Sequence, residues 1–162
     1  MHAVEVYAKY LRDGRIKIDP AKKIQGPLTY QDPCNLSRSG DLAGYGRYII
    51  SHLAHDFRDM APNREHNHCC GGGAGFVPMG PTFKRRRMES GRVKAEQIRA
   101  TGAKTIIVPC HNCFDQIQDL NTEYRLGVKV TSFKELITHA MIVPEEFLPE
   151  DGHEKSNEKQ NA

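Results

Sequence analysis

The 162-residue sequence has no apolar stretch approaching the ~20 residues of a membrane helix, so no direct membrane span is expected. Its first residues, MHAVEVYAKYLRDG, contain neither an apolar core nor a cleavage site of the signal-peptide type. The net charge of +3 is too small to indicate a nucleic-acid partner. Neither a Ser-His-Asp nor a paired-carboxylate arrangement can be recognised. These absences favour a cytoplasmic location and no nucleic-acid partner.

Cysteine is scarce, and its count is odd. The cysteines are Cys34, Cys69, Cys70, Cys110 and Cys113. A disulfide framework would leave one thiol over, and the cytoplasm would keep the others reduced. Clustered cysteines in an intracellular chain more often bind metal or perform redox chemistry. All five are therefore candidate metal ligands.

Apolar periodicity predicts an α/β fold, with a small parallel sheet flanked by helices. A helix ending at Gly14 and a short edge strand, RIKID, come first. Three further strands are expected at 28–31, in KTIIVPC and in GVKVTSF, and helices at 43–60, 82–100, from 111 and at 133–141. The stretch 61–81 is expected to be a loop, because it is rich in Pro, Gly and Asn.

Two cysteines follow predicted strands directly. Cys34 comes after the first strand of the sheet and Cys110 after the second, at the carboxyl edge where parallel sheets bind ligands. The loop with Cys69 and Cys70 can reach the same edge. The fold therefore predicts that cysteine-bearing loops meet at the carboxyl ends of the strands.

Cys110 and Cys113 form a CxxC motif at a helix start. Residues i and i+3 of a first turn face the same way, so two thiolates can chelate one metal centre. The helix N-terminus favours negative charge, so the pKa values of these thiols should fall. By itself, CxxC is typical of zinc sites, iron–sulfur sites and thioredoxin-like redox sites alike.

The string CCGGGAG places two cysteines side by side before glycines. Adjacent side chains of extended backbone point to opposite sides, so the pair suits a larger object better than one tetrahedral ion. Structural zinc takes four ligands, whereas a multi-iron cluster could use all five cysteines. Gly71, Gly72 and Gly73 could approach a cofactor closely and donate N–H groups to its sulfurs. The alternative is a flexible glycine loop beside two structural thiols.

The spacing C-x34-CC-x39-CxxC, with YQDPCNLSR, CCGGGAG and GAKTIIVPCHNC around it, resembles the CCG (cysteine-rich) domain family. The resemblance covers about residues 3–140. That domain occurs in the catalytic subunit of heterodisulfide reductase and in related iron–sulfur redox subunits, including those of sulfate-reducer electron-transfer complexes. Domain boundaries follow: an N-terminal helix and edge segment over 1–26, a CCG-type domain over 27–144 and a polar, disordered tail over 145–162.

The resemblance implies a non-cubane [4Fe-4S] cluster bound by Cys34, Cys69, Cys70, Cys110 and Cys113. It also implies electron transfer to or from a disulfide or thiol substrate, with other redox subunits of a complex, which in some cases is membrane-bound, as partners. Some family members bind zinc instead, so a zinc-binding structural module without turnover is the alternative function. Family chains usually have two copies of the motif and often a ferredoxin-like cysteine run, and this sequence has one copy and no such run. Its second spacer is also slightly longer than usual.

Two other features are candidates for function. His111, inside CxxC, could give a proton to a departing thiolate, and His68 is a weaker candidate of the same kind. KRRR at 84–87, with Arg92, Lys94 and Arg99, makes one helix basic. Most such runs are solvated faces, and the functional alternative is a docking patch for a small acidic carrier protein or an anionic thiol.

Overall fold

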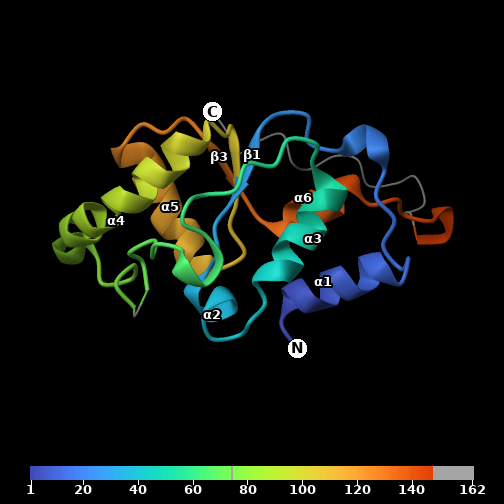
Figure 1. The fold of residues 1–162 in the computed structure, drawn as a ribbon, viewed down its shortest axis with the longest axis horizontal. Coiled ribbons are helices and arrows are strands. Elements are labelled where there is room, and N and C mark those ends of the chain that lie inside the picture. The colour runs from blue at the N-terminus through green and yellow to red at the C-terminus, as the bar shows by residue number, and fades with distance from the viewer. Residues whose placement is uncertain (74, 148–162) are drawn as a thin grey trace.

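A computed structural model describes residues 1–73 and 75–147 of the chain, which form an α/β fold around a parallel sheet (Figure 1). The strands are β1 (Leu28–Tyr30), β2 (Thr105–Ile107) and β3 (Lys129–Thr131), in the order β1-β2-β3. Leu28 pairs with Thr105, and Thr105 pairs with Lys129. The prediction of a small parallel sheet flanked by helices is confirmed.

Helices cover both faces of this sheet. The helices are α1 (Ala3–Arg12), α2 (Cys34–Ser37), α3 (Ala43–Leu53), α4 (Pro81–Thr101), α5 (His111–Glu123) and α6 (Phe133–Ala140), and the 3-10 turns are η1 (Pro20–Lys22), η2 (Arg64–His66) and η3 (Glu145–Phe147). Figure 1 shows α4 and α5 together on one side of the sheet, and α1, α3 and α6 on the other. The chain therefore forms three layers, with the sheet in the middle.

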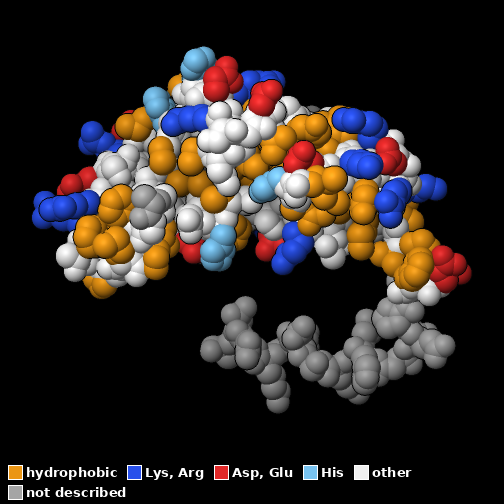
Figure 2. All heavy atoms as spheres, turned by 90° about the horizontal axis from the view of Figure 1, so that it is seen from below, with side chains coloured by type: hydrophobic (Ala, Val, Ile, Leu, Met, Phe, Trp, Pro, Cys, Tyr) orange, Lys and Arg blue, Asp and Glu red, His pale blue; other side chains and the backbone are white. Residues whose placement is uncertain are grey.

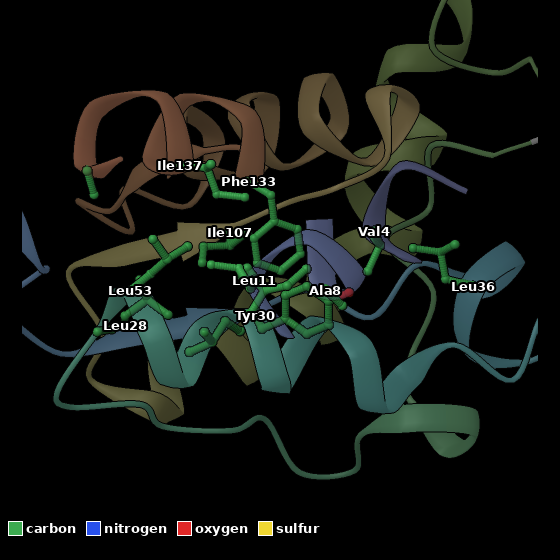
Figure 3. Packing of buried hydrophobic residues seen from close by; sticks show 14 residues of the cluster. Val4, Ala8, Leu11, Leu28, Tyr30, Leu36, Leu53, Ile107, Phe133 and Ile137 are labelled. Atoms are coloured by element: carbon green, nitrogen blue, oxygen red, sulfur yellow. The ribbon is translucent and has the colours of Figure 1, made fainter. Parts of the chain in front are cut away.

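The alternation of side chains along β2 divides the buried residues into two clusters. Ile107 packs with Tyr30 and Phe133 in the cluster beneath α1, α3 and α6 (Figure 3). Ile106 and Val108 point the other way, into the cluster beneath α4 and α5. A continuous apolar run is what a strand buried on both faces requires, and TIIV at 105–108, which includes β2, supplies it.

Local signals fix some of the helix ends. Ser132 and Glu135 form a capping box at the start of α6, with the Ser132 hydroxyl accepting from the Glu135 N–H. Gly102 follows α4 in the left-handed conformation, with φ of +63°, as expected for a C-terminal stop. Helix α1 ends at Arg12, before Gly14, as predicted.

Two predicted elements were wrong. The helix expected over 43–60 ends at Leu53, because the following residues extend and pair beside β1: the Leu28 N–H donates to the Asp56 carbonyl at 2.8 Å. Phe57 therefore forms a bridge to Leu28 instead of continuing a helical stripe. RIKID is not a strand of the sheet, since Ile18 makes only an isolated antiparallel bridge to Met141. In both segments, contacts with distant chain override the local pattern.

The structure describes only the first residues of the predicted tail. Of the segment 145–162, only 145–147 are described, and they form the turn η3; residues 148–162 lie outside the described residues. Helix α1 packs in the same cluster as β1 and α3, which joins the N-terminal segment to the main core. Across residues 1–73 and 75–147, no helix combines the length and apolarity that a membrane span needs.

Candidate metal centre

All five cysteines line one cavity of about 200 Å³ at the carboxyl edge of the sheet. Cys34 is the first residue of α2, just after β1, and Cys110 is the N-cap of α5, just after β2. Cys69 and Cys70 come from the loop between α3 and α4. The expected meeting of cysteine-bearing loops at the carboxyl ends of the strands is confirmed.

The thiols differ in exposure. Cys70 and Cys113 are buried with their sulfurs 3.2 Å apart, whereas Cys34 and Cys69 are exposed and Cys110 is half-buried. The neighbours Cys69 and Cys70 therefore present one thiol toward the surface and one toward the core, as extended backbone at this position predicts.

The glycines after the cysteine pair do two different things. The N–H groups of Gly71 and Gly72 donate to the sulfurs of Cys69 and Cys70, each at 3.4 Å. Gly72 also lies so close to α5 that a Cβ would be 2.6 Å from the Gln116 Cβ. Gly73 has open space around it and lines the cavity. The run thus combines close packing with amide donors aimed at sulfur.

The thiols share protons in a network. Hydrogen bonds with Cys113 and Cys69 lower the pKa of Cys70 to about 3. A hydrogen bond with Cys113, and then the N–H groups of the first turn of α5, lower the pKa of Cys110 to about 6. Hydrogen bonds with Cys110 and Cys70 raise the pKa of Cys113 instead. The pKa of Cys110 falls, as predicted for a thiol at the start of a helix, but the largest cause is its hydrogen bond with Cys113. The pKa of Cys113 rises, contrary to the prediction, because its hydrogen bonds with Cys110 and Cys70 favour the protonated thiol.

An ion pair that the sequence did not indicate holds the loops around the cavity. Arg47, from α3, donates to both carboxylate oxygens of Asp32 at 2.8 and 2.9 Å and to Asp59 at 2.7 Å. The buried Asp32 carboxylate also accepts from the Arg64 N–H at 2.7 Å. Since Asp32 lies two residues before Cys34, this pair fixes the first cysteine loop against the loop that leads to Cys69.

A second set of bonds connects the same loops. Arg38 donates to the backbone carbonyls of Glu65, at 3.0 Å, and of Asn67. The Asn67 side chain donates to the Asp32 carbonyl at 2.6 Å. Arg38 and Asn67 thus hold the loop that bears Cys34 against the loop that leads to Cys69.

The two candidate histidines lie differently. The His111 side chain is 88% exposed, with its Nε2 3.7 Å from an oxygen of Asp115, and it is not among the described residues that line the cavity. His68 does line the cavity. Of the two candidate histidines, His68 is therefore the one that lines the cavity.

The basic helix α4 is not simply a solvated face. Lys84, Arg85 and Arg92 are exposed and form ion pairs with carboxylates of α4 or α5. Arg87 and Lys94, in contrast, are buried. On the face shown in Figure 2, charged side chains of both signs are interspersed with apolar ones. The expectation of one continuous solvated basic face was wrong at the two buried positions, where tertiary contacts enclose the side chains.

A second, larger pocket adjoins the cysteine cavity. It has a volume of about 500 Å³ and shares Cys69 and Gly73 with the lining of the cysteine cavity. The rings of Phe76 and Phe83, with centroids 5.8 Å apart, contribute its apolar wall. An organic molecule in this pocket would lie directly beside the exposed Cys69 thiol.

Comparison with known proteins identifies the arrangement. A family model described as "Cysteine-rich domain" (CCG) matches residues 28–118, which include all five cysteines. The chain belongs to the cysteine-rich domain family. The match begins with β1 and ends within α5, so it spans both strand ends that bear Cys34 and Cys110.

Similar proteins are longer redox proteins. The cysteine-rich chain is 24% identical over 147 residues to an Hdr-like menaquinol oxidoreductase iron-sulfur subunit of Archaeoglobus profundus, covering 88% of this chain and 26% of that protein. It is 30% identical over 142 residues to one subunit of the dihydromethanophenazine:CoB–CoM heterodisulfide reductase of Methanosarcina mazei, covering 87% and 34%. It is also 30% identical over 135 residues to one subunit of the fumarate reductase (CoM/CoB) of Methanothermobacter marburgensis, covering 82% and 26%. The chain therefore spans about a quarter to a third of the length of these relatives.

The cysteine cavity contains the thiol donors of a metal–thiolate centre, but two of the sulfurs lie closer together than they would on one metal ion. Among the described residues, no three His, Cys, Asp or Glu side chains stand ready to hold a metal ion. Two sulfurs on one tetrahedral metal, with bonds of ~2.3 Å, lie about 3.8 Å apart. The Cys70 and Cys113 sulfurs, at 3.2 Å, would need to separate by about half an ångström. The donor set, the sulfur-directed amides and the volume fit such a centre after this small expansion.

Proposed function

We propose that the five cysteines hold an iron–sulfur cluster and that the chain is a redox domain of a larger complex. The observation that carries the proposal is that all five thiols line one cavity, although they come from three separate segments. The relatives whose names call them iron-sulfur subunits support it. Cys34, Cys69, Cys70, Cys110 and Cys113 are the proposed ligands.

The size of the cavity favours a cluster over one zinc ion. A water molecule occupies about 30 Å³ of liquid, so the cavity of about 200 Å³ corresponds to roughly seven waters. One tetrahedral ion takes four ligands, which would leave one of the five thiols without a role. A multi-iron cluster would fill this cavity and could be bound by all five thiols. The family resemblance favours the non-cubane [4Fe-4S] type.

The proposed reaction is electron transfer to or from a disulfide or thiol substrate. A bound cluster would supply one-electron chemistry, which a protein of ordinary side chains lacks. The apolar pocket beside Cys69 offers a place for the organic part of such a substrate. The relatives are named as subunits, which supports the proposal that partner redox subunits supply the electrons.

A proton donor completes the proposal. Reduction of a disulfide yields thiolates, and a histidine that titrates near neutral pH can protonate one of them. His111, next to Cys110 in the chain, remains the candidate from the motif. His68 lines the cavity and is the natural comparison. The substitutions His111→Gln and His68→Gln, each assayed for disulfide reduction across pH, would separate the two.

The deciding experiment is elemental analysis of the full chain, purified and reconstituted without oxygen. We expect about four iron atoms and four acid-labile sulfides per chain. One zinc ion and no sulfide, even after reconstitution with iron and sulfide, would contradict the proposal and favour the zinc-binding structural module.

Single substitutions test the ligand set. We expect Cys69→Ser and Cys70→Ser each to lower the iron content or change the visible spectrum, because both thiols are proposed ligands. Asn35→Ser is the control, since Asn35 lines the same cavity without a thiol. Normal iron content and an unchanged spectrum in either cysteine variant would disprove the five-ligand set.

A further inference from the structure

Lys94 is a buried lysine, whereas lysine side chains ordinarily lie at the surface. It lies in α4 with a relative exposure of 0%. Its ammonium donates to the Asn67 Oδ1 at 2.6 Å and to the Gln97 Oε1 at 2.5 Å, and its Nζ lies 3.6 Å from the Met60 sulfur. All three contacts are uncharged, so the ammonium is hydrogen-bonded but touches no anion.

No carboxylate of the described residues is paired with this charge. The ion pairs formed within residues 1–73 and 75–147 do not include Lys94. Asp32 is a carboxylate whose charge acts on Lys94, but both its oxygens are bonded to Arg47. A buried cation without a counter-charge strongly disfavours folding, so a compensating anion is expected nearby.

Asn67 connects Lys94 to the cysteine cavity. Its side chain accepts from the Lys94 ammonium, and Asn67 is also one of the residues that line the cavity. Burial lowers the pKa of Lys94 to about 8, and the neighbouring Cys70 charge is the largest effect that opposes this fall. Met60, another contact of the ammonium, packs in the same cluster as Cys70 and Cys113.

We propose that Lys94 is the internal counter-charge of the centre that the five cysteines bind, and that it stabilises the reduced form of that centre. An added electron makes a thiolate-ligated cluster more negative, and a fixed cation nearby favours the more negative state. Lys94 touches none of the thiols, so it is a positioning residue that acts through its charge. The inference rests on the proposed function and adds the element that sets the reduction potential.

The first test removes the charge. In the reconstituted full chain, Lys94→Met should retain iron and sulfide while its midpoint potential becomes more negative. We expect the ratio of reduced to oxidised centre at a fixed potential to fall about tenfold, which is ~59 mV for one electron. Lys104→Met is the matched control, because Lys104 is exposed and precedes β2 at the opposite edge of the sheet. It changes the net charge equally and should leave the potential unchanged.

A second variant keeps the lysine and neutralises it. Gln97→Glu places a carboxylate where the Lys94 ammonium already donates, so it should lower the potential in the same direction. Gln118→Glu adds the same charge at an exposed position of α5 and is the control. This pair decides the question if Lys94→Met fails to fold.

The outcomes separate the two proposals. A wild-type chain that binds iron and sulfide, with potentials of Lys94→Met and Gln97→Glu equal to those of their controls, overturns the role of Lys94 and leaves the cluster intact. A wild-type chain that binds only zinc overturns the proposed cluster. In that case the counter-charge is tested by chelator competition, where Lys94→Met should bind zinc at least tenfold more weakly than Lys104→Met. A chain that takes up neither metal overturns both.

Discussion

At the scale of single residues, the site depends on side chains that belong to no recognisable sequence motif. The buried Asp32 carboxylate accepts three hydrogen bonds, two from Arg47 and one from the Arg64 N–H. Asp32 and Arg64 are 32 residues apart in the chain, so the carboxylate closes a long loop. Asp32, two residues before Cys34, therefore holds Cys34 in position relative to the loop that leads to Cys69.

This arrangement predicts a large effect of Asp32→Asn on the free energy of unfolding. The substitution leaves Arg47 with only the Asp59 carboxylate, and breaking a buried ion pair costs about 3 kcal/mol or more. Asp56→Asn is the control, because the Asp56–Arg58 pair, with side chains 40% and 46% exposed, should be worth about 0–1 kcal/mol. Urea unfolding of the reduced apo chain measures both. Equal costs for the two variants would show that Asp32 does not organise the loops.

At the scale of elements, the contact between α4 and α5 determines where the cysteine pair lies. Gly91 of α4 approaches α5 so closely that a Cβ would be 2.8 Å from Leu120 Cδ2 and 3.0 Å from the Cys70 carbonyl. Only a residue without a side chain permits this approach. The glycine that weakens α4 as an isolated helix thus brings Cys70 within reach of Cys113.

Helix propensity and tertiary packing therefore predict opposite signs for Gly91→Ala. Alanine favours a helix by ~1 kcal/mol, but overpacking costs about 1–3 kcal/mol, so we expect net destabilisation. Gly44→Ala in α3 is the control, since no atom lies within 4 Å of the added methyl, and it should be neutral or stabilising. Thermal unfolding of the apo chain distinguishes them. Stabilisation by Gly91→Ala would mean that α4 can move away from α5 at little cost.

At the scale of the whole molecule, the cysteine cavity lies where separate parts of the fold meet. Cys70 and Cys113 belong to the cluster beneath α4 and α5, whereas Cys34 begins the helix whose Leu36 packs in the other cluster. A group bound by all five thiols would connect both clusters and all three segments. Binding to the folded state alone then stabilises the entire domain.

Removal of the bound group should accordingly lower the melting temperature of the chain. A ligand at about a thousand times its Kd adds ~4.1 kcal/mol, and each kcal/mol shifts Tm by roughly 2–4 °C at this size. We expect a loss of about 10 °C when the reconstituted protein is stripped by a chelator under oxidising conditions. Cys70→Ser should lose less than the wild type in the same treatment, because it lacks one of the proposed ligands. An unchanged Tm in the wild type would mean that the group does not join the two clusters.

Local sequence patterns are sufficient to predict the order of elements, the parallel sheet and the place of the cysteines. These follow from periodicities of two and 3.6 residues and from breaks at proline and glycine, which are properties of neighbouring residues. The apolar run of β2 and the capping box of α6 are recognisable for this reason. The spacing of the thiols, together with strand ends at Cys34 and Cys110, is enough to predict their convergence.

Long-range packing, in contrast, sets where α3 ends, which basic residues are buried and which groups surround the thiols. The Lys94–Asn67 bond spans 27 residues and the bond from Asn67 to Asp32 spans 35, and contacts this remote leave no periodic trace in the sequence. Lysine is ordinarily exposed, so a basic helix suggested a solvated face. Lys94 is buried because α4 packs against the loop that bears the cysteine pair. Such burial is a property of the whole fold, so the local sequence does not predict it.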